Sequence, residues 1–210
     1  MDAKQIMKYF EDTAYVRMGG SEEERKCAQY LIKCCEDMGL EATLESFSVD
    51  MATMQEAVLL VDGKEVPCKG YLNAGSGEVE APLYYLRNTD PYSLSLCKDK
   101  IVLIDGYMGY WMYQDLLENG AIGFVTYDGN ANYVDYDIDQ RELRSFVSKG
   151  NKIPGVNINA KHAISIIEAD SQNAKIILRQ EEYEGKSHNV VLDMPGQIDQ
   201  YIVLTAHYDS

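Results

Sequence analysis

Two continuous apolar runs that flank a helical stretch constrain the fold of this chain more than any other feature. The runs are "KDKIVLIDGY" (98–107) and "IGFVTYDG" (122–129), and "WMYQDLLENGA" (111–121) lies between them with Gly120 as a helix stop. Continuously apolar strands are typical of parallel sheets buried on both faces, and a strand–helix–strand order gives parallel neighbours through a crossover connection. The sequence therefore predicts an α/β fold, in the mixed sense that includes α+β arrangements.

The first 50 residues predict two helices followed by a strand. Asp2 can cap a helix that runs to about Thr13, and Ser21 followed by Glu24 forms a capping box for a second helix that ends at Gly39. "LEATLESFSVD" (40–50) then alternates as a strand does. One face of the second helix carries residues at helical spacing and is expected to be buried: Cys27, Leu31, Cys34, Cys35 and Met38.

The cysteine content bears on the cellular compartment. The chain has five cysteines, an odd number, and three of them lie in the second predicted helix. A complete disulfide framework is therefore impossible, and a reducing, cytoplasmic location is expected. Because no CxxC pair is present, core packing is favoured over a metal or redox role for these thiols.

The middle of the chain predicts several strands and one further helix. "EAVLLVDGKEV" (56–66) contains an Asp-Gly hairpin signal, and "IPGVNINAKHAISIIEADSQNA" (153–174) predicts a strand and then a helix. "KIILRQEEYEG" (175–185) predicts another strand, and residues 188–210 predict two strands joined by a turn at Pro195–Gly196. Neither end of the chain can bury a core alone, so we expect 1–50 and 185–210 to pack together, with 51–184 inserted as a separate domain.

The charge of the chain excludes some classes of partner. The formal net charge of −15 disfavours binding to nucleic acid or to an anionic membrane surface, since both need positive charge. No stretch approaches the roughly 18 to 20 apolar residues of a membrane span. The first residues, "MDAKQIMKYFEDTAYV", contain acidic residues and no apolar block, so they do not predict a secretory signal.

The sharpest chemical signal is "AHYDS", in which His207 and Asp209 follow an apolar run. A neutral imidazole is a good zinc ligand, and a nearby carboxylate commonly orients a ligating histidine. Sites in α/β folds are built at the carboxyl ends of strands, where His207 is expected to lie. Taken alone, the His-x-Asp spacing is weak evidence, and an ordinary polar strand end is the alternative.

The segment "NVVLDMPGQIDQYIVLTAHYDS" (189–210) resembles the stretch that enters the active site of the co-catalytic zinc aminopeptidases, the family that includes aminopeptidase Y and glutamate carboxypeptidase. "RMGGSEEERKCAQYLIKCCEDMGLEATLESF" (17–47) resembles the N-terminal stretch of the same family. "SGEVEAPLYYL", "KDKIVLIDG", "ENGAIGFVTYD" and "IPGVNI" resemble the protease-associated domain that many members carry as an insertion. The order of these matches is more specific than any one of them.

The resemblance implies an N-terminal part of a zinc-dependent exopeptidase, an aminopeptidase that cleaves terminal peptide bonds of a peptide substrate. It implies that His207 is one ligand of a two-zinc centre and that Asp209 orients the imidazole without binding metal. The remaining ligands and a glutamate base would lie beyond Ser210, so this stretch alone is expected to bind zinc weakly and to be inactive. The alternative is a non-catalytic protease-associated domain that binds peptide or protein. An exposed sheet edge at the terminal strands also predicts a homodimer.

Three further features have simpler explanations. Asp135, Asp137 and Asp139 have calcium-like spacing, but the Gly and Glu of an EF-hand loop are missing, so an acidic loop is the better description. Several aromatic residues could contact peptide, although packing is favoured: Tyr107, Tyr110, Trp111 and Tyr113. His162 and His188 have no ligand partner at recognisable spacing.

Overall fold

The computed structural model describes residues 2–127, 138–198 and 200–209, so Asp135 and Asp137 of the acidic motif lie outside the described residues. The chain divides into two compact units. The terminal unit consists of Met1–Met51 and Glu184–Ser210, and the central unit of Ala52–Tyr183. Among the described residues, no helix has the length and apolar character of a membrane span.

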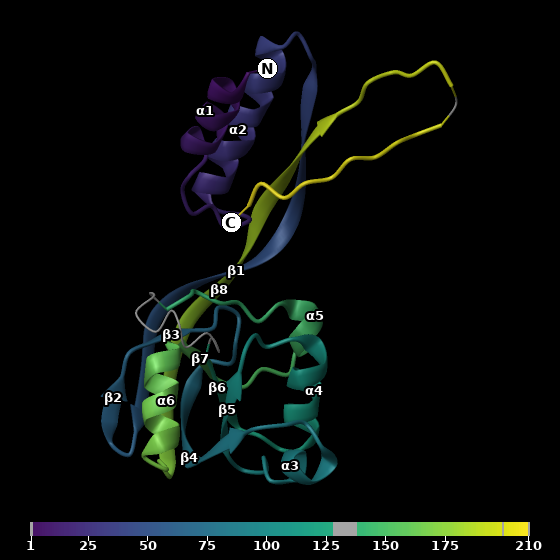
Figure 1. Ribbon diagram of the computed structural model, residues 1–210. Helices are drawn as coiled ribbons and strands as arrows, with labels where there is room; N and C mark the ends of the chain where they lie inside the picture. The colour runs from purple at the N-terminus through teal and green to yellow at the C-terminus, as the bar shows by residue number, and fades with distance from the viewer. Residues whose placement is uncertain (1, 128–137, 199, 210) are drawn as a thin grey trace. The chain divides into compact units, whose positions relative to one another are not determined.

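Eight strands form one mixed sheet, in the order β2-β1-β8-β4-β5-β6-β7-β3 (Figure 1). Strands β4 to β7 are parallel, whereas β2, β3 and β8 run antiparallel to β1, β7 and β4. The strands are β1 (Ala42–Val61), β2 (Lys64–Val66), β3 (Cys68–Gly70), β4 (Gly77–Leu86), β5 (Ile101–Asp105), β6 (Gly123–Tyr127), β7 (Gly155–Ile158) and β8 (Asn173–Leu192). The helices are α1 (Ala3–Asp12), α2 (Glu22–Asp37), α3 (Pro91–Ser95), α4 (Tyr110–Glu118), α5 (Ser145–Ser148) and α6 (Ala160–Glu168). The predicted mixed α/β class is confirmed.

The predicted crossover connection is confirmed in the central unit. Strand β5 pairs in parallel with β6, and α4 connects them. Helices α4 and α6 lie on opposite sides of the parallel strands, which explains why the strands are apolar throughout (Figure 1). Phe124 of β6 lies at the centre of the core, with the rings of Tyr71 and Tyr113 edge-on to it at 5.0 and 6.0 Å.

Gly155 shows how tightly this core is packed. A Cβ atom at this position would lie 2.0 Å from the ring of Phe124, so only glycine lets β7 approach β6 at this point. The Asp62–Gly63 turn between β1 and β2 is also confirmed. Both turn residues have positive φ, 48° and 76°, which is the geometry that makes Asp-Gly a hairpin signal.

Strands β1 and β8 differ from the prediction. The sequence suggested separate strands on either side of residue 51 and on either side of residue 186, but each pair forms one strand of 20 residues. No turn signal interrupts either pattern, and Gly185 remains within β8 as a point of close approach. A Cβ atom there would lie 2.5 Å from Cγ of Met51.

Both predicted N-terminal helices form. The Asp2 carboxylate accepts the N–H of Gln5 at 2.8 Å, and Gly39 has a φ of 74° after the end of α2. The expected buried stripe of α2 is partly wrong, because Met38 is 50% exposed. Met38 is the C-cap residue, where the chain leaves the helical path and therefore the stripe.

The strand expected before His207 does not form. Residues 201–209 have no strand structure, and the side chains of Tyr201 to Leu204 are almost entirely exposed. A strand needs a neighbour to satisfy its backbone hydrogen bonds. Among the residues that the structure describes, none pairs with this segment as a strand, and an apolar pattern alone does not supply one.

Candidate functional site

The His207–Asp209 pair has the predicted side-chain geometry. Nδ1 of His207 lies 3.0 Å from Oδ1 of Asp209. Because a carboxylate only accepts hydrogen bonds, Nδ1 must be the donor, and in the neutral form of the ring the lone pair then resides on Nε2. The imidazole is 94% exposed and the carboxyl side chain 49% exposed, so this nitrogen is accessible.

The pair has the chemistry of one zinc ligand with its orienting carboxylate, and it fits a zinc ion in that respect. A structural or catalytic zinc site needs three or four protein ligands. Across the described ranges, no group of three or more His, Cys, Asp or Glu side chains is close enough to hold a metal ion. His207 therefore supplies one donor, and the described residues do not complete a site.

Tyr208, between the two candidate residues, is held at both its side chain and its backbone. Its hydroxyl group hydrogen-bonds with the carboxylate of Glu24 and lies 2.6 Å from the carbonyl oxygen of His188. Its carbonyl oxygen accepts a hydrogen bond from Nε of Arg17. Burial, and then the neighbouring Glu24 carboxylate, raise the pKa of Tyr208, so the hydroxyl keeps its proton.

Glu24 is fully buried in the first turn of α2, an unusual position for a glutamate. The capping box is only half formed, because Ser21 Oγ accepts the N–H of Glu24 at 3.1 Å but the Glu24 carboxylate points elsewhere. Its Oε2 lies 3.2 Å from Nδ1 of His188, while Oε1 accepts from Tyr208. His188, which has no ligand partner at recognisable spacing in the sequence, thus has a hydrogen-bonding partner 164 residues away.

Arg17 connects this cluster to the loop between α1 and α2. Its guanidinium group donates to the carbonyl oxygen of Tyr15 at 2.8 Å and to that of Thr13, in addition to that of Tyr208. The C-terminal end of the chain consequently lies beside the first turn of α2, as Figure 1 shows.

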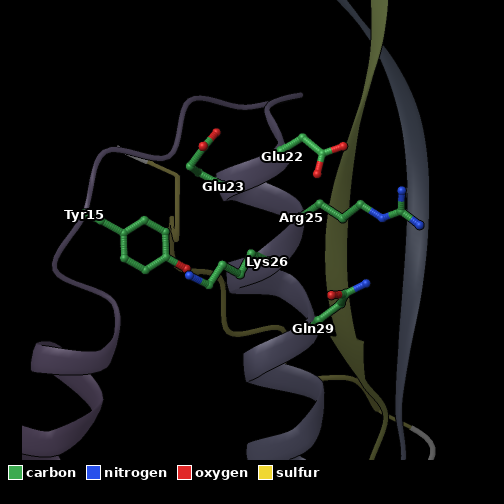
Figure 2. A pocket seen from close by; sticks show the side chains of 6 residues that line it. All are labelled: Tyr15, Glu22, Glu23, Arg25, Lys26 and Gln29. Atoms are coloured by element: carbon green, nitrogen blue, oxygen red, sulfur yellow. The ribbon is translucent and has the colours of Figure 1, made fainter.

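An open hollow of about 610 Å³ lies along the outer side of the same turn (Figure 2). The ring of Tyr15 faces Lys26 across it, with Nζ 5.3 Å from the ring centroid. The hollow is lined by Tyr15, Glu22, Glu23, Arg25, Lys26 and Gln29. Two carboxylates and two cations balance one another, so its charge selects neither an anion nor a cation.

The aromatic residues singled out in the sequence do not form one surface. Tyr113 is fully buried and donates to the carbonyl oxygen of Asn151 at 2.8 Å, so it has a packing role. Trp111 is 78% exposed and lies edge-on to Tyr110 at 5.0 Å. Tyr107 is exposed as well, and the guanidinium of Arg141 lies 5.5 Å from its ring centroid. His162 is half-buried on α6.

No protein-family model matches the sequence, and no curated protein is significantly similar to it. The fold, however, is that of solved bacterial aminopeptidases and related peptidases. It matches a zinc aminopeptidase from Bacillus subtilis with a TM-score of 0.66 and 20% identity, over 93% of this chain and 47% of that one.

Two further structures show the same likeness. The aminopeptidase from Aneurinibacillus sp. strain AM-1 matches with a TM-score of 0.64 and 18% identity, over 94% of this chain and 49% of that one. The peptidase M28 precursor from Shewanella amazonensis SB2B matches with 0.64 and 16%, over 89% and 48%. The chain thus spans about half the length of these structures, and at these identities the likeness shows the fold alone.

Proposed function

We propose that this chain is part of a zinc-dependent exopeptidase, an aminopeptidase, and that His207 is one of its metal ligands. The observation that carries the proposal is the His207–Asp209 hydrogen bond, which leaves Nε2 free to bind metal, in a chain with the fold of solved aminopeptidases. Asp209 is the orienting carboxylate. The central unit is a protease-associated domain that shapes the substrate entrance or mediates assembly.

Two zinc ions, when bound, would polarise the scissile carbonyl and activate the attacking water. This chain's own contribution is to present Nε2 of the imidazole as a donor atom. Asp209 keeps the proton of His207 on Nδ1 and stabilises the ring orientation. The described residues offer a single donor of this kind, so we expect these 210 residues alone to bind zinc weakly and not to hydrolyse peptides.

The direct test is cleavage of amino-acid p-nitroanilides by the intact protein, with zinc content measured in parallel. His207→Ala should lower kcat/KM at least about 100-fold and reduce bound zinc, because loss of a ligand removes the metal. His162→Ala removes a half-buried histidine of α6 and is the matched control. Unchanged activity and zinc content in His207→Ala would remove this residue from the mechanism.

One observation favours a second candidate, a non-catalytic module that binds peptide or protein through the central unit. Trp111 and Phe146 expose large apolar side chains on α4 and α5, two helices in contact. Tryptophan and other aromatic residues commonly anchor protein interfaces. Loss of peptide binding in Trp111→Ala would favour this candidate, provided that a zinc chelator leaves peptide binding by the intact protein unchanged.

The exposed segment from Tyr201 to Leu204 supports a homodimer as a further part of the proposal. Four consecutive exposed residues with strand preference are ready to pair with the same segment of a second copy. Sedimentation of the 210-residue chain should show a concentration-dependent dimer that Ile202→Lys abolishes. A strictly monomeric chain at high concentration would contradict dimer formation.

A further inference from the structure

Tyr208, the residue between the candidate ligand and its orienting carboxylate, contacts the side chains of Glu24 and Arg17 and the carbonyl oxygen of His188, whose imidazole in turn contacts Glu24. We propose that Glu24, His188 and Arg17 are positioning residues that anchor Tyr208 and thereby orient the His207–Asp209 pair. The inference rests on the proposed function only in that His207 is taken to bind metal.

The geometry around Tyr208 explains how an anchor at one residue orients its two neighbours. Neighbouring side chains of an extended chain point to opposite sides, and residues two apart point to the same side. The 3.0 Å hydrogen bond shows that His207 and Asp209 share one side. Tyr208 is partly buried between these two exposed residues, so a Tyr208 held inward keeps both partners outward.

Burial of Glu24 shows that the anchor is a specific arrangement. Glu22 and Glu23 in the same turn are exposed, whereas Glu24 is completely buried. A carboxylate is unfavourable in such a place unless donors satisfy it. The described donors to its side chain are Nδ1 of His188 and the hydroxyl of Tyr208, so each carboxylate oxygen has one partner.

The backbone contact adds a second restraint. Arg17 donates to the carbonyl oxygen of Tyr208 and, through the other side of its guanidinium, to the loop that precedes α2. Anchoring at the hydroxyl alone would permit the chain to rotate about the ring axis. Contacts at both the ring hydroxyl and the backbone remove that freedom, and they restrict the orientation of the residues on either side.

A purely structural role is the alternative, and the test must separate the two. The variants are Tyr208→Phe and Glu24→Gln in the intact protein. Tyr201→Phe, which removes a hydroxyl from an exposed tyrosine, and Glu23→Gln, an exposed neighbour on the same turn, are the matched controls. If Glu24→Gln does not fold, Tyr208→Phe still decides, because it deletes one oxygen atom.

The first readout needs no metal. In the metal-free protein, the imidazole ¹⁵N resonances of His207 should report a single Nδ1–H tautomer, held by Asp209. Both variants should shift these resonances toward those of a freely averaging imidazole, and neither control should. Unchanged resonances in Tyr208→Phe would overturn the proposal, whatever happens to the melting temperature.

The second readout is zinc affinity of the intact protein, measured by competition with a chromophoric chelator. Loss of a group that orients a ligand typically weakens metal binding by about 10- to 100-fold, and we expect that range for both variants. Equal zinc affinity in the variants and the wild type would also contradict the proposal that Tyr208 is anchored to orient His207. If His207→Ala leaves zinc binding intact, the proposed function fails instead, while the metal-free resonances still decide the anchor.

Discussion

The two units of this protein differ in the kind of residues that they bury. The central unit is built around one apolar core, with Phe124 at its centre and parallel strands buried on both faces. In the terminal unit, Cys27 and Ala28 are the only buried apolar residues among those that the structure describes. Its buried centre is instead polar, with Glu24 satisfied by His188 and Tyr208.

The difference teaches which unit carries its own stability. Burial of apolar surface is the main stabilising contribution to a fold, and among the described residues nearly all of the buried apolar side chains belong to the central unit. The terminal unit leaves large apolar side chains exposed on both of its segments: Ile6, Met7, Phe10, Val16, Phe47, Met194, Ile198 and Ile202 are examples. Its buried carboxylate, Glu24, is held by specific hydrogen bonds, which favour a defined geometry more than a high stability.

The largest expected contrast comes from removing one aromatic ring from each unit. Phe124→Ala should lower the free energy of unfolding by about 3–5 kcal/mol, because it opens a cavity beside Tyr71 and Tyr113. Phe10→Ala should change it by no more than about 0.5 kcal/mol, since that ring is 66% exposed. Urea denaturation followed by circular dichroism measures both. Equal losses would refute the comparison.

Two glycines give a smaller contrast of the same kind. Gly155→Ala places a methyl group against the buried Phe124 ring and should cost about 1–3 kcal/mol. Gly185→Ala meets the side chain of Met51, which can rotate away, so its cost should be lower. Thermal unfolding of the two variants measures both losses of stability. A larger decrease in melting temperature for Gly185→Ala would contradict the tighter packing of the central unit.

The smallest effect concerns two aspartates, one in each unit. Backbone N–H groups, first that of Asn173, lower the pKa of Asp62, while the side chains of Lys8 and then Tyr30 lower that of Asp12. A lowered pKa in the folded state gives stability that is present above the ordinary value of 3.8 and is lost as pH falls through the lowered value. Both contributions should therefore disappear on acidification.

Salt separates these two contributions. Lys8 and Asp12 form an exposed ion pair, which 1 M salt should screen, whereas the hydrogen bonds from the backbone to Asp62 should persist. Acid titrations of stability with Asp62→Asn and Asp12→Asn, at low and high salt, provide the measurement. An equal response of both sites to salt would show that the Asp62 effect is also a simple charge attraction.

Local signals predicted most of the elements. Caps at Asp2 and Ser21, the Asp62–Gly63 turn and the crossover around α4 all depend on residues close in sequence, and all are present. The length of β1 and β8 was missed because the sequence pattern shows where turns are favoured, not where two predicted strands continue as one. The strand before His207 was predicted from its apolar pattern, but strand formation also needs a neighbour.

The polar cluster could not be located from spacing, because Glu24 and Tyr208 are 184 residues apart. One signal was nonetheless available. Glu24 precedes Cys27 and Ala28 by three and four positions, which places a charged residue on the apolar stripe of its helix. A glutamate in that position predicts a buried partner. Because Glu24 was interpreted as part of a capping box, its position on the apolar stripe was not used to predict a buried partner.

The close approach of Gly185 to Met51 has a consequence for how such a protein can gain or lose a part. β1 enters the central unit just after Met51, and β8 leaves it just before Gly185, in the opposite direction along a neighbouring strand. The entry and exit points are therefore adjacent, and a tight hairpin would join them directly. Replacement of residues 52–183 by such a hairpin would leave Met51 and Gly185 at their present separation.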